Sequence, residues 1–256
     1  MKISTQQLSV LSKGNYITNK ITATFESANI NLILGKNGAG KSTFLRSLMG
    51  FGETAGIVTV GTTPLTEMNT LKKSQVFAWL PTHVDTPFSY SVEDVVMMGR
   101  FPRHQGTPRK RDWLVVDKWL YNFDLTALRK RKTNMLSTGE LKRTHLARCF
   151  ASDCPIIVLD EPFSNLDLSS AYKITEIFNE EVELGKNIIL SIHDLNLATK
   201  FGSNYVFLKS GELYIAGDRD EVFCPTHIKN VFDLELNLFK NDEKTRYEFS
   251  PLKSQS

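Results

Sequence analysis

Residues 35–43 read GKNGAGKST and directly follow the apolar run INLIL at residues 30–34. They fit the pattern G-x-x-x-x-G-K-[ST], and FLRSLMG at 44–50 continues with the apolar spacing of an amphipathic helix. Glycines let successive backbone N–H groups curl around a β-phosphate, while Lys41 reaches the β- and γ-phosphates and the Ser42 hydroxyl ligates Mg²⁺. The stretch therefore predicts a nucleoside triphosphate site between a buried strand and a helix. The residues that carry the pattern are Gly35, Gly40, Lys41 and Ser42.

A second candidate element is the stretch IIVLDEP at residues 156–162. Apolar residues followed by an acid are common at strand ends, but after a phosphate-binding loop they indicate the magnesium side of the sheet. We expect Asp160 to hold the metal through water and Glu161 to polarise the attacking water. His193 in SIHDLN follows the next strand, so we expect it at the same edge as a γ-phosphate contact.

The hydrophobic pattern divides the chain into regions. Residues 1–34 alternate polar and apolar positions, which predicts antiparallel strands that lead into a buried one. Residues 44–86 predict short strands separated by turns, and residues 88–150 are mostly helical in spacing. From 151 to 217 strands alternate with helices, which predicts a mainly parallel sheet covered on both faces. The segment LNLFKNDEKTRYEFS is a candidate hairpin.

Length, charge and cysteine content narrow the class of protein. The 256 residues are 41% hydrophobic, enough for one domain with a packed core, and the net charge of +3 is too small to indicate nucleic-acid binding by itself. Three cysteines without CxxC spacing suggest neither a disulfide framework nor a zinc site. The opening residues lack the apolar core of a signal peptide, and no apolar run approaches the ~20 residues of a membrane span.

Further motifs make the chain resemble the ATP-binding cassette (ABC) proteins. These are LSTGE, which differs by one residue from the usual LSGGE, the strand VLDEP, the segment SNLD at 164–167 and the histidine of SIHD, in addition to the phosphate-binding loop. The resemblance covers nearly the whole chain. It implies an α/β fold of the P-loop NTPase type, with a RecA-like, mainly parallel sheet, an antiparallel β subdomain and an inserted helical subdomain. The expected ABC ATPase domain covers 1–240, with the helical subdomain at about 88–150 and a polar C-terminal tail at 241–256.

The resemblance also implies a role for each motif residue. ATP and Mg²⁺ are the expected ligands, and two cassettes pair head to tail so that the signature helix of one subunit caps the γ-phosphate held by the other. Asp167 would lie between the two sites and couple them. The expected metal ligands are Ser42 and Asp160, and the expected catalytic residues are Glu161 and His193. The residues expected to bind ATP are Gly35, Asn37, Gly38, Ala39, Gly40, Lys41, Ser42 and Thr43. The signature residues expected to contact the opposite subunit's ATP are Ser137, Thr138, Gly139 and Glu140.

Two positions depart from the family pattern. Thr82 follows the LP at 80–81, where the family has a glutamine that reaches magnesium, and threonine is too short for that reach unless its loop moves inward or a water bridges the gap. The family also has an adenine-stacking aromatic residue near the end of the first strand. The corresponding stretch here is 10–12, and the nearest aromatic residue is Tyr16.

The finer resemblance is to importers. The segments SVEDVVMMGRFPRH and HDLNLATKFG are similar to cassettes that import ferric siderophores, haem and cobalamin. An alternative interpretation of the first segment is a helix that stops at Pro102. The resemblance implies a homodimer of cassettes at the cytoplasmic face of the cell membrane, with two permease subunits, an indirectly coupled substrate-binding protein and no nucleic acid. The competing hypothesis is a soluble ABC-type ATPase coupled to nucleic acid or repair. The basic stretches 100–111 and 129–132 are either solvated faces or contacts to lipid headgroups or the permease.

Overall fold

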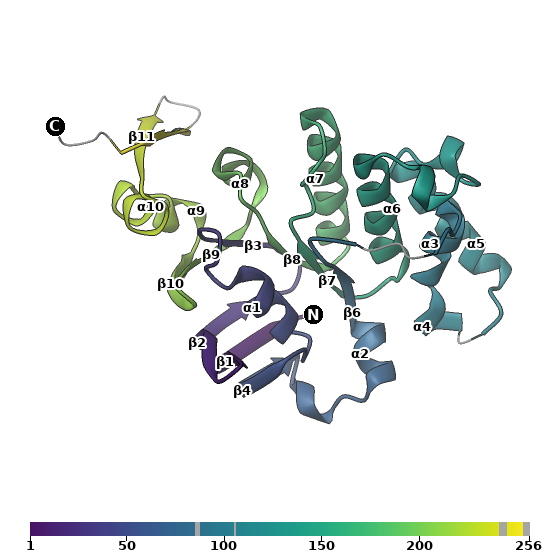
Figure 1. The fold of residues 1–256 in the computed structure, drawn as a ribbon, viewed down its shortest axis with the longest axis horizontal. Coiled ribbons are helices and arrows are strands. Elements are labelled where there is room, and N and C mark those ends of the chain that lie inside the picture. Colours follow the sequence, from purple (N-terminus) through teal and green to yellow (C-terminus); the bar gives the residue numbers. More distant parts are fainter. Residues whose placement is uncertain (85–87, 105, 241–244, 253–256) are drawn as a thin grey trace.

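The central element of the computed structural model is a six-stranded sheet with the strand order β10-β9-β3-β8-β7-β6 (Figure 1). The structure describes residues 1–84, 88–104, 106–240 and 245–252. Five strands of this sheet run parallel, and only β10 is antiparallel, to its neighbour β9. This arrangement confirms the predicted mainly parallel sheet. The strands are β3 (Ile30–Leu34), β6 (Phe77–Leu80), β7 (Ile156–Asp160), β8 (Asn187–Ser191), β9 (Asn204–Lys209) and β10 (Glu212–Gly217).

A second, antiparallel sheet with the order β2-β1-β4-β5 covers one face of the first. It consists of β1 (Ile3–Ser12), β2 (Asn15–Phe25), β4 (Glu53–Val60) and β5 (Thr63–Pro64), followed by a short 3-10 turn, η1 (Leu65–Glu67). The alternation in residues 1–34 therefore predicted antiparallel strands correctly, because one face of β1 and β2 is buried and the other is solvated.

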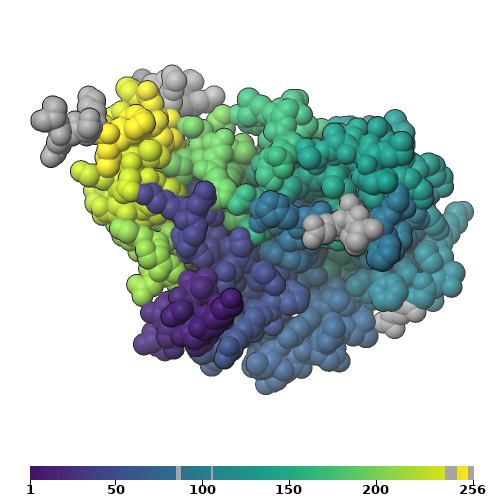
Figure 2. Space-filling view, in the orientation of Figure 1, coloured from purple at the N-terminus to yellow at the C-terminus, as the bar shows by residue number. Residues whose placement is uncertain are grey.

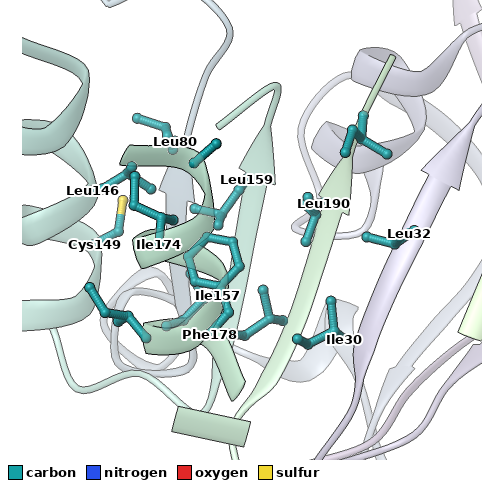
Figure 3. Close-up of a cluster of buried hydrophobic side chains, with 14 of the residues drawn as sticks. Ile30, Leu32, Leu80, Leu146, Cys149, Ile157, Leu159, Ile174, Phe178 and Leu190 are labelled. Atoms are coloured by element: carbon teal, nitrogen blue, oxygen red, sulfur yellow. The ribbon is translucent and has the colours of Figure 1, made fainter. Parts of the chain in front are cut away.

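Side chains of the central strands alternate between two cores. Val158 of β7 points toward helix α1 (Lys41–Ser47) and the antiparallel sheet, where it shares a cluster with Phe44. Ile157 and Leu159 point to the other face, where α7 (Leu168–Glu183) packs its Phe178 against them (Figure 3). Both faces of the parallel sheet are thus dry, which is why its strands read as continuous apolar runs.

A mostly helical region forms one end of the molecule, and the C-terminal part lies at the other end (Figure 1 and Figure 2). Aromatic contacts join its elements to the core: Trp119 and Phe150 have ring centroids 5.1 Å apart, and Phe150 stacks on Phe178 at 5.5 Å. The elements are α3 (Val92–Met98), α4 (Phe101–His104), α5 (Lys110–Asn122), the 3-10 turns η2 (Thr126–Leu128) and η3 (Thr133–Met135), and α6 (Thr138–Ala151).

One local prediction from the sequence was wrong, and one alternative interpretation does not hold. The stretch expected to hold only short strands and turns includes a helix, α2 (Thr70–Val76), whose start is fixed by Asn69 because its side chain accepts from the Lys72 N–H at 2.8 Å. Pro102 does not stop a helix, since it is the second residue of α4. Instead, α3 ends before Gly99, where a Cβ atom would lie 2.1 Å from the Arg148 carbonyl oxygen.

The C-terminal part continues beyond the central sheet as helices and a strand pair. Here β11 pairs antiparallel with β12, as expected for the candidate hairpin, and the pair spans the boundary at 240–241 that the sequence suggested for a tail. Residues 241–244 and 253–256 of that tail lie outside the described residues. The elements are α9 (Arg219–Val222), α10 (Pro225–Phe232), β11 (Leu234–Lys240) and β12 (Thr245–Pro251), whereas α8 (Leu195–Phe201) lies earlier, between β8 and β9.

Three cations of the two basic stretches form ion pairs within the helical region. Arg100 is buried, pairs with Asp112 at 3.1 Å and donates to the Ala151 carbonyl at 2.8 Å. Arg129 and Lys130 both pair with Glu93. These pairs link elements of the helical region, and Arg100 is the buried cation among them, whereas the Lys130 side chain is 79% exposed. Among the residues that the structure describes, no helix is long and apolar enough to span a membrane.

Candidate functional site

The phosphate-binding loop lies between β3 and α1, as the sequence predicted. Gly35 and Gly40 have φ angles of 154° and 93°, and a Cβ atom on Gly35 would lie 2.3 Å from the Leu208 carbonyl oxygen. At Gly40 a Cβ atom would approach Thr18 to 2.9 Å. Both positions therefore require glycine, because the neighbouring strands β9 and β2 support the loop closely from behind.

Lys41 extends along this loop with only 5% of its surface exposed. Its ammonium donates to the carbonyl oxygens of Gly35 at 2.8 Å and Lys36 at 3.0 Å. Burial lowers the pKa of Lys41, and the carboxylates of Glu161 and Asp160 oppose that shift. The cation is thus held beside the loop and across from two acids.

The carboxyl end of β7 delivers the acidic pair to the same edge of the sheet. Asp160 is 2% exposed and accepts two hydrogen bonds, from the Ser191 hydroxyl at 2.5 Å and from the Thr82 hydroxyl at 2.6 Å. Glu161 contacts the imidazole of His193 through Oε1 and Nε2. Three strand ends therefore converge, since β6 leads to Thr82, β7 to the acids and β8 to Ser191 and His193.

The contact between Thr82 and Asp160 explains how this chain uses a position where glutamine was expected. The hydroxyl is short, but it reaches the carboxylate that we expect to hold the metal. His83, the next residue, lines the pocket described below. The side chain of Thr82 therefore fixes the orientation of one Asp160 oxygen while the other oxygen is fixed by Ser191.

An open pocket with a volume of about 700 Å³ brings most of the expected site residues together. This volume is within the range of small-molecule and cofactor sites. The expected residues that line it are Asn37, Gly38, Gly40, Lys41, Ser42, Thr43, Thr82, Glu161 and His193. Asp160 lies buried beneath the pocket wall, and Gly35 and Ala39 support the loop rather than line the pocket.

The signature residues and Asp167 do not line this pocket. Ser137 and Glu140 form a capping box at the start of α6, in which the Ser137 side chain accepts from the Glu140 N–H and the Glu140 side chain accepts from the Ser137 N–H at 2.7 Å. Asp167 caps α7 by accepting from the Ser170 N–H at 2.8 Å, and its hydrogen bonds lower its pKa. Gly139 lies against the segment before α7, since a Cβ atom there would be 3.1 Å from the Asn165 carbonyl oxygen.

Sequence reasoning missed some residues of the site. Ser191 bridges the acids, because its hydroxyl donates to Asp160 and accepts from the Glu161 N–H at 3.0 Å. Its only signal in the sequence is a small polar residue at a strand end, two positions before His193. Ile17 lines the pocket, whereas Tyr16, the aromatic residue nearest the expected stacking position, is 61% exposed and does not line it.

Comparisons with known proteins agree with this geometry. The sequence profile of the family described as "ABC transporter" matches residues 18–164. The hemin import ATP-binding protein HmuV of Pseudomonas aeruginosa is 31% identical over 245 residues, covering 93% of this chain and 95% of that protein. The cobalamin import ATP-binding protein BtuD of Halobacterium salinarum is 30% identical over 238 residues, covering 92% of this chain and 60% of the relative.

A solved structure resembles the whole chain. A putative metal-chelate type ABC transporter in an inward-facing conformation superposes with a TM-score of 0.82 at 25% identity, and the match covers 98% of both chains. The α/β cassette fold expected from the motifs is thereby confirmed.

Proposed function

The chain belongs to the ABC transporter family, and from that premise we propose that it is the ATP-hydrolysing subunit that energises uptake of a metal chelate through a separate membrane permease. The observation that carries the ATPase role is the convergence of the glycine-rich loop, Lys41 and the acidic pair around one pocket. As a member of this family the chain is an ATPase, and the finer roles of its residues are proposed below.

The loop and its lysine are proposed to bind the triphosphate. Asn37, Gly38, Gly40 and Lys41 line the pocket, so the backbone of this loop is placed to bind phosphate oxygens. The Lys41 ammonium would exchange its contacts with the loop carbonyls for the β- and γ-phosphates. Charge-assisted hydrogen bonds of this kind are stronger than neutral ones.

The oxygen donors at the site fit Mg²⁺. This ion prefers oxygen ligands and is commonly held by one or two protein groups together with substrate phosphates. Ser42 would supply a hydroxyl, and Asp160 a carboxylate that its two hydroxyl partners already orient. When bound, the ion would neutralise charge on the transferring phosphoryl group.

Glu161 and His193 are proposed as the catalytic pair. Glu161 would orient and polarise the attacking water, which is the role of a general base in hydrolysis. His193 contacts the same carboxylate and lines the pocket, so it is placed to hold that carboxylate and to contact the γ-phosphate.

A second copy of the chain is the proposed partner at the nucleotide. Ser137, Thr138, Gly139 and Glu140 start a capped helix but do not line their own pocket, as expected if they complete the pocket of the opposite subunit. Asp167, which caps the start of α7, would couple the two nucleotide sites.

The proposed cargo class follows from the relatives. Hemin and cobalamin, named for two relatives, are both metal chelates, and the resemblance of HDLNLATKFG adds ferric siderophores. The permease and its binding protein would select among these compounds. The membrane's cytoplasmic face is the corresponding proposed location, and the comparisons lend no support to the nucleic-acid alternative.

Purification from membranes tests this proposal. Affinity-tagged chain carrying Glu161→Gln, expressed in its native cell and isolated in detergent with ATP and Mg²⁺, should retain a polytopic permease, and ATPase activity of the wild-type complex should rise with a loaded binding protein. Recovery without any membrane protein, together with hydrolysis stimulated by DNA or RNA, would contradict it.

A further inference from the structure

Lys142 of helix α6 contacts the main chain of two separate site segments. Its ammonium donates to the carbonyl oxygen of Thr82 at 3.2 Å and to the carbonyl oxygen of Glu161 at 3.1 Å. The three positions come from α6, the loop after β6 and the loop after β7. One side chain therefore ties the signature helix to the strand ends that carry the catalytic base and the Asp160 partner.

The main chain at Glu161 is in a conformation that needs support. Its φ angle of 51° is left-handed, which is uncommon for a residue with a side chain. Its N–H donates to Ser191, and its carbonyl oxygen accepts from Lys142 and from the Ser164 hydroxyl at 3.0 Å. Lys142 is the one charged donor among these contacts, and charged donors make the stronger hydrogen bonds.

Burying the Lys142 ammonium costs desolvation free energy unless its hydrogen bonds compensate for that cost. Only 6% of the residue is exposed, although lysine is rarely buried without partners. Burial lowers the pKa of Lys142, while the carboxylates of Glu161 and Asp160 oppose that shift. A methionine would fill the same space without this desolvation cost. The presence of a cation here is thus better explained by its hydrogen bonds to the Thr82 and Glu161 carbonyl oxygens than by packing.

The position of Lys142 on α6 gives the contact a further consequence. Ser137 caps the same helix five residues earlier, about 7.5 Å along the axis at ~1.5 Å per residue. Any displacement of this helix at its capped start would therefore move the ammonium that holds the Glu161 main chain.

We propose that Lys142 is a positioning residue that fixes the Glu161 and Thr82 main chain to α6 and so aligns the Glu161 carboxylate for hydrolysis. This inference rests on the proposed function of Glu161. Lys142 would contact neither nucleotide nor magnesium, and it would act on the rate of the chemical step rather than on ATP affinity.

Steady-state kinetics of Lys142→Met and Lys142→Arg test the proposal, with Lys118→Met as the matched control. Lys118 is another paired lysine, on α5, outside the pocket. Lys142→Met should lower kcat by ~10-fold or more, the scale of a misplaced reacting group, while the KM for ATP and the Kd of a fluorescent ATP analogue stay unchanged. Lys142→Arg keeps charged donors and should recover part of the lost kcat, and Lys118→Met should behave as wild type.

The same experiment separates failure of this inference from failure of the proposed function. Glu161→Gln is measured in parallel: if it abolishes turnover while Lys142→Met matches the Lys118→Met control, Lys142 does not position the base. A loss of kcat in Lys142→Met that Lys142→Arg does not relieve, or an equal loss of nucleotide binding, also overturns the inference. If Lys142→Met does not fold, Lys142→Gln replaces it, because its amide is too short to reach both carbonyls, and the same outcomes apply. Unchanged turnover in Glu161→Gln would contradict the proposed function itself.

Discussion

Two buried lysines face two carboxylates at the nucleotide pocket. Lys41 and Lys142 are both almost fully buried, and Asp160 and Glu161 oppose the lowering of the pKa of each lysine. Only Lys41 lines the pocket, so the two cations are assigned different tasks: one binds the triphosphate and the other holds the main chain.

Replacement of Lys41 should separate these tasks. Lys41→Ala removes a charged donor to two phosphates, at about 1.5–3 kcal/mol for each hydrogen bond, so the Kd for ATP should rise by about 100-fold or more. Equilibrium titration with a fluorescent ATP analogue measures this change in Kd. Lys36→Ala is the control, since Lys36 lies in the same loop but its side chain pairs with Asp233. Equal affinity in the two variants would refute the phosphate role of Lys41.

His145 provides a test by pH. It is buried on α6, and within the described ranges neither ring nitrogen has a hydrogen-bond partner. Burial, aided by Arg148 and Lys142, lowers its pKa from 6.5 to about 3. Between these values the unfolded chain binds a proton that the folded chain does not, so this residue makes the free energy of unfolding fall as pH decreases below 6.5.

The expected size of that effect is about 2 kcal/mol between about pH 7.5 and 5. In His145→Leu, which cannot titrate, the free energy of unfolding should therefore fall by about 2 kcal/mol less over this range than in the wild type. Urea denaturation at the two pH values, compared for both proteins, gives the difference. Identical pH dependence would show that His145 becomes protonated without unfolding or is not buried.

Among the elements, those with contiguous chemical signals could be predicted and those set by distant contacts could not. The loop after β3 and the acids after β7 each lie within a few residues, so spacing alone located them. Helix α2 could not be found because TLKKSQV has little apolar periodicity and depends on its Asn69 cap. Ser191 and Lys142 act on segments that are 30 and 60 residues away, and no local pattern encodes such contacts.

A ladder of hydrogen-bonded asparagines crosses the central sheet and connects neighbouring strands. Asn204 of β9 donates to Asn31 of β3 at 3.0 Å, and Asn31 donates to Asn187 of β8 at 2.8 Å. Asn187 in turn donates to the carbonyl oxygens of Met1 and Phe25. The ladder therefore links three parallel strands to the antiparallel sheet and to the first residue.

Removing the inner member of this ladder should destabilise the fold. Asn187→Ala leaves two buried polar groups, the Asn31 amide and the Phe25 carbonyl, without this partner, and at about 1–3 kcal/mol for each unsatisfied group we expect a loss of about 2 kcal/mol or more. Asn204→Ala, at the less buried end, leaves one such group and should lose about 1 kcal/mol. Chemical denaturation measures both. Equal losses would mean that the ladder does not carry this stability.

In the whole molecule, the phosphate-binding loop and the signature helix are expected to serve different nucleotides. Mixing two inactive variants tests this. Lys41→Ala removes phosphate binding, and Ser137→Arg places a bulky cation where the opposite γ-phosphate would lie. In a mixed dimer one composite site carries both lesions and the other is intact, so part of the ATPase activity should return. Two different affinity tags select the mixed dimers. If these dimers remain inactive, the two composite sites do not act independently.

The most direct test of the account is the mass of Glu161→Gln in solution with ATP and Mg²⁺. Loss of a general base slows a reaction by ~10² or more, so ATP should persist in the closed site. Light scattering after size exclusion should then give twice the 29.0 kDa of the chain, with one ATP for each subunit, and the mass should return to that of the monomer when Lys41→Ala is added. A protein that binds ATP, hydrolyses it at the wild-type rate and stays monomeric would contradict both the catalytic role of Glu161 and the composite site.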